Sequence, residues 1–160
     1  MSINAGDKVP SVTFKTMGEN GPENLSSDDL FAGKKVVLFA VPGAFTPTCS
    51  AKHLPGFVEK ADAFKAKGVD TVACVSVNDA FVMGAWGKDQ KVGEKVKMLA
   101  DGNGAFAEAC GLVLDASGGG LGKRMQRCAM VVENGKISKL FVEAPGQFEK
   151  STAENVLANL

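Results

Sequence analysis

The sequence has little that would draw the protein to a charged partner or into a membrane. Its 18 Lys and Arg residues balance 18 Asp and Glu residues, and this zero net charge disfavours nucleic acid or an anionic membrane as a partner. The longest uninterrupted apolar run, residues 36–41, is far shorter than the roughly 20 residues of a membrane-spanning helix. Residues 1–10 show no basic segment followed by an apolar stretch, so no signal peptide is visible. We therefore expect a soluble protein of the cytoplasm.

The chain is also poor in the patterns that build metal sites and disulfide scaffolds. It has one histidine, His53, and no Cys-x-x-Cys pair, whereas a structural zinc site needs four ligands that usually come in closely spaced pairs. With 45% apolar residues, the core is large enough to fold without disulfides. We therefore expect no metal and no organic cofactor, and each cysteine is either a buried thiol or a thiol that does chemistry. The four cysteines are Cys49, Cys74, Cys110 and Cys128.

What is present is the patterning of one α/β domain over residues 1–160, without repeats or linkers. Residues 35–41 and 70–77 are apolar almost throughout, which is typical of strands buried on both faces. A helical stretch lies between them, roughly over 55–67. Strand, helix and strand in this order predict a parallel pair joined by a right-handed crossover.

The rest of the chain predicts further elements on either side of this unit. Residues 3–15 are expected to be extended, and Ser26-Ser27-Asp28-Asp29 to start a short helix that Gly33 stops. Helices are expected over 79–88, capped by Asn78 or Asp79, and over 105–110, with a strand at 96–100 between them. Asn134-Gly135 predicts a hairpin of 128–133 with 136–143, and Ser151-Thr152-Ala153-Glu154 a capping box before the last helix. This order is that of a single thioredoxin-like domain, with a central mixed β-sheet flanked by helices.

The segment that carries chemistry follows the first buried strand directly. It reads Val-Pro-Gly-Ala-Phe-Thr-Pro-Thr-Cys-Ser over residues 41–50 and delivers Cys49 to the start of a helix. Helix N-termini carry unpaired N–H groups and partial positive charge, which stabilise a thiolate and make the sulfur a nucleophile. Thr46 lies three residues earlier, so its hydroxyl could reach the sulfur or a ligand bound to it. The alternative is an inert cysteine buried under a proline-rich loop.

The chain resembles a peroxiredoxin of the type II subfamily, which includes plant and bacterial members and the animal fifth peroxiredoxin. Pro42, Thr46 and Cys49 match the Pro-x-x-x-Thr-x-x-Cys signature of the family, and the whole string 41–50 is characteristic of the subfamily. The similarity continues through 53–57, 75–79 and 99–101 to Arg127 and the hairpin, and so spans nearly the whole chain.

The resemblance implies a role for each matched residue in reducing a hydroperoxide. Cys49 would attack one peroxide oxygen and become a sulfenic acid. Arg127 would hold Cys49 as thiolate and bind the peroxide oxygens, Thr46 would position the substrate, and Pro42 would shield the site from water. The backbone N–H groups of Thr48 and Cys49 would also hold the peroxide. Donors aimed at the oxygen on which charge grows lower the barrier to breaking the O–O bond.

Two arginines lie in the segment before the predicted strand at 128–133. We assign the catalytic role to Arg127 because it directly precedes that strand, whereas Arg124 is interpreted as a solvated surface charge. Without the family resemblance, Arg127 would be interpreted in the same way.

The resemblance leaves open how Cys49 is regenerated. The late loop, residues 149–151, has no second cysteine, which counts against the route of animal members. Plant-type members carry a cysteine where Cys74 stands, so Cys74 could resolve the sulfenic acid by forming a disulfide with Cys49 after local unwinding. A buried core thiol is an equal interpretation of Cys74, and only geometry can decide whether the two could bridge. We favour a one-cysteine cycle with glutathione and glutaredoxin, with thioredoxin as the alternative reductant. The resemblance also implies a homodimer.

Two other functions compete with the peroxidase. His53 follows Cys49 by four residues, and a Cys-His pair is what a thiol hydrolase or acyl transferase needs. Pro55 interrupts the helix nearby and no acid partner is apparent, so we interpret His53 as structural. The third hypothesis is a redox sensor in which oxidation of Cys49 changes partner binding. Cys110 and Cys128 have core contexts and are assigned no chemistry.

Overall fold

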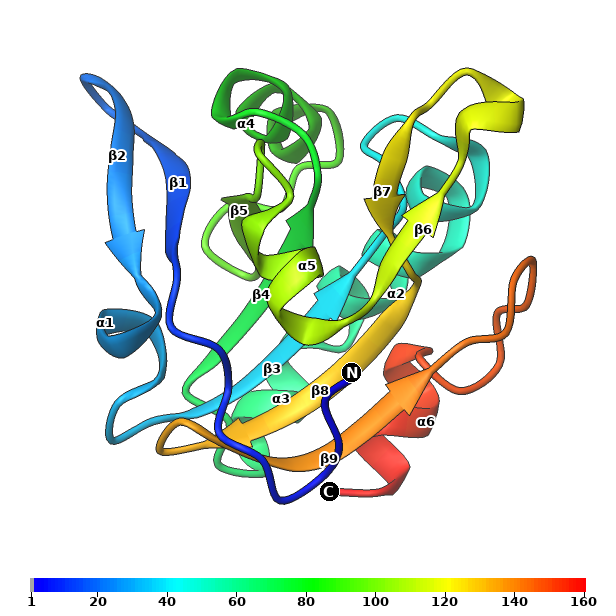
Figure 1. Ribbon diagram of the computed structural model, residues 1–160. Helices are drawn as coiled ribbons and strands as arrows, with labels where there is room; N and C mark the ends of the chain where they lie inside the picture. Colours follow the sequence, from blue (N-terminus) through cyan, green and yellow to red (C-terminus); the bar gives the residue numbers. More distant parts are fainter. Residues whose placement is uncertain (1) are drawn as a thin grey trace.

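The computed structural model describes residues 2–160, and its centre is a mixed β-sheet (Figure 1). Strands β3 (Lys35–Ala40), β4 (Thr71–Ser76) and β5 (Lys97–Ala100) run parallel to one another. On the other side of β3, β8 (Cys128–Glu133) pairs antiparallel and continues through the predicted hairpin into β9 (Lys136–Val142). The strand order within residues 2–160 is β2-β1-β5-β4-β3-β8-β9. The parallel pair and the hairpin predicted from the sequence are confirmed.

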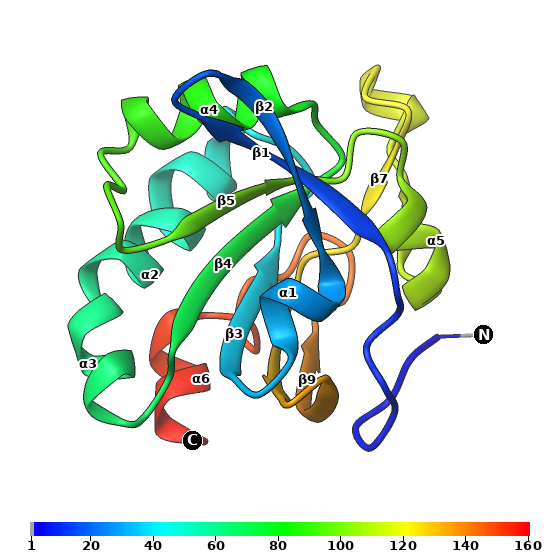
Figure 2. The same cartoon turned by 90° about the vertical axis from the view of Figure 1, so that its left-hand side faces the viewer.

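Helices cover both faces of the sheet, which explains why its central strands are apolar at most positions (Figure 2). Val37 and Phe39 of β3 face one apolar cluster, whereas Val36 and Leu38 face the other. The first cluster is covered by α2 (Leu54–Glu59), α3 (Ala61–Ala66), α4 (Ala80–Asp89) and α6 (Ala153–Ala158). The second is covered by α1 (Ser27–Phe31) and α5 (Ala105–Cys110).

The first residues of the chain differ from the prediction of a simple extended start. Strand β1 (Thr13–Gly18) turns back into β2 (Gly21–Ser26), and the two form an antiparallel hairpin at the edge of the sheet. The sequence did not predict β2 because Gly-Pro-Glu-Asn-Leu-Ser contains no β-branched or aromatic residue. Its Pro22 is tolerated because an edge strand leaves one side unpaired.

The helical stretch predicted over 55–67 is divided into shorter pieces. A π-helical turn, η1 (Cys49–His53), runs directly into α2, and a break at Lys60 separates α2 from α3. Pro55 lies in the first turn of α2 and has no N–H to donate to the η1 turn before it. Its ring crowds the preceding turn, which favours the wider spacing in which the Leu54 N–H donates to the Cys49 carbonyl.

The helix caps agree with the sequence in most places and differ in one. Asp79 caps α4 by accepting a hydrogen bond from the Val82 N–H, as predicted. The last helix is capped by Thr152 instead of Ser151, so the predicted capping box is wrong. The Ser151 hydroxyl donates instead to the carboxylate of Glu143 at 2.7 Å, a non-local contact that the local pattern does not contain.

A small antiparallel pair, β6 (Val113–Asp115) with β7 (Lys123–Met125), projects from the sheet beside the loop that follows β3 (Figure 1). The 3-10 turn η2 (Ser117–Gly119) lies at its tip. This arm positions the site because β7 leads directly to Arg127, which faces Cys49. Across residues 2–160, no helix has the length and apolar character to cross a membrane.

Candidate active site

Cys49 lies at the edge of the sheet where β3 ends, as the first residue of η1, and its side chain is fully buried. The loop that leads to it is held by contacts from the next parallel strand. The Ala44 N–H donates to the Asn78 side-chain oxygen at 3.0 Å, and the Ser76 hydroxyl donates to the same oxygen at 2.6 Å. Phe45 has a φ of +63°, a conformation that only a constrained turn imposes on a residue with a large side chain. The turn that presents Cys49 is therefore fixed by its neighbours.

Arg127 reaches Cys49 from the junction between β7 and β8. Its Nη2 donates to the Cys49 Sγ at 3.2 Å, and its Nη1 lies 2.8 Å from the His53 Nδ1. The ring of Phe148 lies against the guanidinium, with 5.6 Å between the Arg127 Cζ and the ring centre. The guanidinium therefore places a positive charge directly against the Cys49 sulfur. The structure thus brings together the two residues that the sequence singled out, although they are 78 positions apart.

His53 is fully buried, and both of its ring nitrogens are engaged. Its Nε2 lies 3.0 Å from the Ser151 carbonyl oxygen. A carbonyl can only accept, so the proton resides on Nε2 and the Nδ1 lone pair accepts from Arg127. Burial, reinforced by the charge of Arg127, lowers the pKa of His53 to about 3. A histidine in this state has no lone pair left to take a proton from Cys49, which argues against the thiol hydrolase or transferase alternative.

A cavity of about 190 Å³ lies over the site. It is lined by Pro42, Thr48, Leu114, Gln126, Arg127, Glu143 and residues 144–146. Of the predicted site residues, Pro42, Thr48 and Arg127 form its wall, whereas Cys49 and Thr46 do not line it. Two of the lining residues adjoin Cys49: Arg127 donates a hydrogen bond to its sulfur, and Thr48 precedes it in the chain. A peroxide in this cavity would lie beside the guanidinium, a favourable place for developing negative charge.

Thr46 makes a different contact from the one expected. Its hydroxyl donates to the Gly43 carbonyl at 2.7 Å and not to Cys49. This bond closes the turn, and the Ser50 N–H donates in addition to the Thr46 carbonyl at 3.0 Å. While its proton is committed to Gly43, Thr46 can meet a ligand only as an acceptor.

Arg124, interpreted from the sequence as a surface charge, holds the loop between β3 and Cys49. Its Nη1 donates to the Pro42 carbonyl at 3.3 Å, and its Nε donates to the Leu121 carbonyl at 2.9 Å. A Cβ added at Gly43 would lie 2.8 Å from the same Nη1, so the glycine makes room for the arginine. The sequence signal for this contact was the Pro42-Gly43 pair, because a glycine often marks a position where another group packs closely against the backbone.

Cys74 lies in the middle of β4, paired with Phe39 on one side and with Met98 on the other. It belongs to the same apolar cluster as Cys49. Burial, and then the nearby Cys49, raise the pKa of Cys74 well above its ordinary value, so it is a protonated thiol at neutral pH. Because β4 is paired on both sides, any movement that joined the two cysteines would have to come from the turn at Cys49.

The remaining cysteines behave as core thiols, as expected. Burial raises the pKa of Cys128 to about 12, and it raises that of Cys110 as well. All four cysteines are free. No group of three or more His, Cys, Asp or Glu side chains is placed to hold a metal ion within residues 2–160.

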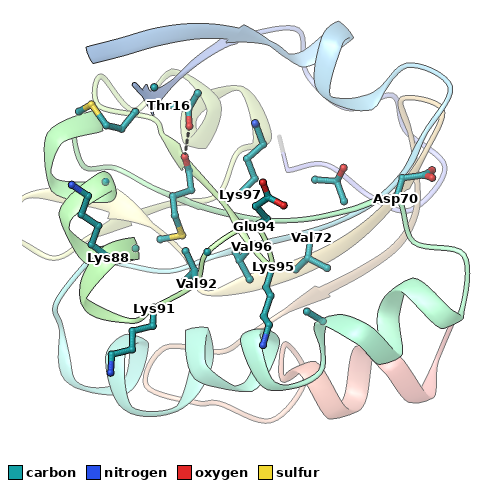
Figure 3. A pocket seen from close by; sticks show the side chains of 18 of the residues that line it. Thr16, Asp70, Val72, Lys88, Lys91, Val92, Glu94, Lys95, Val96 and Lys97 are labelled. Atoms are coloured by element: carbon teal, nitrogen blue, oxygen red, sulfur yellow. Dashed lines mark hydrogen bonds between the residues drawn. The ribbon is translucent and has the colours of Figure 1, made fainter. Parts of the chain in front are cut away.

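A second and larger cavity, of about 790 Å³, lies elsewhere (Figure 3). It is bounded by β1, α3, α4 and the start of β4 and β5, and it shares no lining residue with the cavity at Arg127. Lys88, Lys91, Lys95 and Lys97 stand around it, and its inner wall includes Val72 and Val96. It contains no thiol, so size alone does not locate the chemistry of this protein.

The fold and this site define the class to which the protein belongs. The model of the Redoxin family matches residues 4–157, so the chain belongs to that family. The thioredoxin-like fold expected from the order of its elements is confirmed.

Within the redoxins, the protein is a peroxiredoxin of the type II subfamily, as the sequence resemblance predicted. It is 52% identical over 159 residues to Peroxiredoxin-2C of Oryza sativa subsp. japonica, covering 99% of this chain and 98% of that protein. Identity to Peroxiredoxin-2B of Arabidopsis thaliana is 48%, with the same coverage. The crystal structure of reduced Prx3 in complex with H2O2 from Vibrio vulnificus superimposes with a TM-score of 0.94, at 54% identity and with 98% of each chain covered.

Proposed function

We propose that this protein reduces hydrogen peroxide and organic hydroperoxides to water and alcohols through Cys49, in antioxidant defence and redox homeostasis. The observation that carries the proposal is the hydrogen bond of 3.2 Å from the Arg127 guanidinium to the Cys49 sulfur, beside a cavity. Its relatives support it, since they are peroxiredoxins and one of them has been solved with hydrogen peroxide bound.

The chemistry needs a nucleophilic sulfur and a place for negative charge. The Cys49 thiolate attacks the terminal peroxide oxygen, so an S–O bond forms as the O–O bond breaks. The leaving oxygen carries the electron pair away and takes a proton to become water or an alcohol, and Cys49 is left as a sulfenic acid. Arg127 lies beside both the sulfur and the cavity, where it stabilises the charge on the breaking bond. Thr48, on the cavity wall, would add its backbone N–H.

For the return to the thiol, we favour glutathione and glutaredoxin. Glutathione would condense with the sulfenic acid to give a mixed disulfide and water, and a glutaredoxin thiol would then release Cys49. The central, doubly paired position of Cys74 supports this one-cysteine route. The alternative is a Cys49–Cys74 disulfide that thioredoxin reduces, which the shared apolar cluster of the two residues favours.

The mass of the reduced protein after one equivalent of hydrogen peroxide, with a peptide map, separates these routes. We expect Cys49 alone to gain one oxygen, and added glutathione to convert it to the mixed disulfide. Loss of two hydrogens with Cys49 linked to Cys74 would establish the two-cysteine route, and Cys74→Ser would then abolish turnover with thioredoxin. A protein that does not change would contradict the peroxidase itself. Cys49→Ser is the matched control, since it replaces only the reactive sulfur atom with an oxygen.

Location and assembly are also proposed. An enzyme regenerated by glutathione works in a reducing compartment, which supports the cytoplasm. Three large apolar side chains are exposed among the described residues, Phe45, Phe81 and Leu121, and their burial would favour the homodimer that the family resemblance implies. Light scattering of the purified protein tests this assembly, and the mass of a monomer would contradict it.

A further inference from the structure

We propose that His53 is a positioning residue, which holds the Arg127 guanidinium against Cys49, and that a loop closed by Glu143 keeps His53 in the form that can do so. The inference rests on the proposed peroxidase function, because its consequence is the reactivity of Cys49. It assigns a task to the one histidine of the chain, which the peroxidase chemistry leaves unused.

The first observation is that one edge of the guanidinium is held at both of its nitrogens. Nη1 of Arg127 lies 2.8 Å from the His53 Nδ1, and Nη2 lies 3.2 Å from the Cys49 Sγ. A guanidinium is planar and rigid, so an acceptor that fixes one nitrogen also fixes the other. His53 and Cys49 come from the same turn, η1, and therefore present a single preformed edge to the arginine.

The second observation is that the surroundings select the tautomer of His53. Its Nδ1 can accept from Arg127 only when the ring proton resides on Nε2. The Ser151 carbonyl lies 3.0 Å from Nε2 and can bind only a donor. Phe39 and Phe57 pack beside the ring, with centroids 5.0 and 5.6 Å away, and restrict its rotation. Without the carbonyl, nothing would hold the proton on Nε2, and an N–H on Nδ1 would face the guanidinium and repel it.

The third observation is that the loop bearing this carbonyl is closed by a buried carboxylate. One oxygen of Glu143 accepts from the Glu149 N–H at 2.9 Å, and from the Ser151 N–H and hydroxyl at 2.7 Å each. Burial raises the pKa of Glu143, but the hydrogen bonds from Ser151, Lys150 and Glu149 outweigh it and lower the pKa below the ordinary value. Glu143 is therefore ionised at neutral pH and ties the two ends of the loop together.

The same loop also touches Arg127 directly. The Glu143 N–H donates to the Arg127 carbonyl at 3.0 Å, so the loop starts on the backbone of the arginine itself. Phe148, from its middle, lies against both the guanidinium and His53, with 5.0 Å between its ring centre and that of His53. The loop thus holds the backbone of Arg127 through Glu143, the face of its guanidinium through Phe148, and the edge of its guanidinium through His53.

Two readouts on four variants test the inference. The first readout is the rate of reaction with hydrogen peroxide, followed in a stopped-flow instrument by the fluorescence of Trp86, the single tryptophan, whose Nε1 donates to the Ser50 hydroxyl next to Cys49. The second is the pH profile of Cys49 alkylation by iodoacetamide, quantified by peptide mapping. The alkylation profile reports the thiolate and needs no peroxidase activity. The variants are His53→Leu, His53→Gln, Glu143→Gln and Phe64→Leu.

We expect His53→Leu to react with peroxide about tenfold more slowly and its alkylation profile to move to higher pH, because a hydrogen bond from a charged donor is lost. His53→Gln should stay within about threefold of the unchanged protein, because its amide offers one acceptor and one donor. Glu143→Gln should shift both readouts in the direction of His53→Leu. Phe64→Leu is the matched control, since Phe64 stacks on Phe57 one ring further from His53, and it should lose stability without moving either readout.

The outcomes separate this inference from the function on which it rests. If His53→Leu or, should that variant fail to fold, Glu143→Gln has the alkylation profile and peroxide rate of the unchanged protein, the positioning role is wrong. The role is also wrong if Phe64→Leu moves the readouts equally, since loss of stability alone would then explain them. If the unchanged protein does not react with peroxide, the peroxidase is wrong. A profile that still shifts in His53→Leu would in that case uphold the link from His53 to Cys49.

Discussion

Lowering the pH from 7 to 5 will destabilise the folded protein through one side chain, His53. The ring is fully buried, accepts from Arg127 and donates to a carbonyl, so the folded state holds it neutral. In the unfolded chain the same ring is exposed to water and binds a proton at an ordinary pKa of about 6.5. Acid therefore stabilises the unfolded state while the folded state stays unprotonated.

The magnitude follows from the two pKa values. That of His53 is 6.5 when unperturbed and about 3 in the folded protein. The folded pKa is the lower one, so stability is complete above pH 6.5 and is lost as the pH falls toward 3. Between pH 7 and 5 this linkage amounts to about 2 kcal/mol of unfolding free energy. The lowered pKa of Glu143 adds a loss of the same sign only at lower pH, and the raised pKa of Asp101, which is due to burial, acts in the opposite direction.

Urea denaturation at pH 7, 6 and 5, followed by Trp86 fluorescence, measures this loss, and His53→Gln provides the reference. Since the chain has no second histidine, the difference between the two proteins isolates this residue from every carboxylate. The unchanged protein should lose about 2 kcal/mol more than the variant between pH 7 and 5. Equal losses in the two proteins would show that His53 is protonated in the folded state and would refute the reasoning.

Three substitutions near the sulfur give further expectations. Cys49→Ser should abolish peroxide turnover, and a retained rate in a coupled reductase assay would contradict the role of Cys49. Arg127→Ala should slow the reaction with peroxide by roughly a hundredfold or more in stopped-flow measurements, because it removes a charge preorganised for the breaking bond. Gly43→Ala should cost about 1 kcal/mol in urea denaturation, because its Cβ would lie 2.8 Å from Arg124 Nη1. The cost should shrink in an Arg124→Ala background, and an unchanged cost there would show that the crowding lies elsewhere.

The sequence predicted those parts of the fold whose signal is local. The buried strands β3 and β4 were predicted because both of their faces are covered, which makes the residue pattern apolar almost throughout. The hairpin of β8 and β9 was predicted from Asn134-Gly135, the turn residues that such a connection requires. The edge strand β2 was missed because its side chains are largely exposed and its sequence resembles a loop.

The site was predicted to the extent that a motif or a segment boundary marked it. Cys49 stands in a recognisable string, and Arg127 was chosen for its place before a strand. The contacts of His53 and Arg124 were not predictable, because the Ser151 carbonyl lies 98 positions from the histidine and the Pro42 carbonyl lies 82 positions from the arginine. Thr46 was marked by its place in the motif. The motif does not show that the Gly43 carbonyl accepts the hydrogen bond from its hydroxyl.

The group that faces His53 from Ser151 is a main-chain carbonyl, and every amino acid carries one. Selection cannot act on that contact through the identity of residue 151, except through the separate bond of its hydroxyl to Glu143. The orientation of the imidazole therefore depends on the backbone path of the loop and not on the type of side chain at residue 151. Across related chains the residue at this position can vary while the contact persists. The residues that fix the path of the loop are the ones that should be retained.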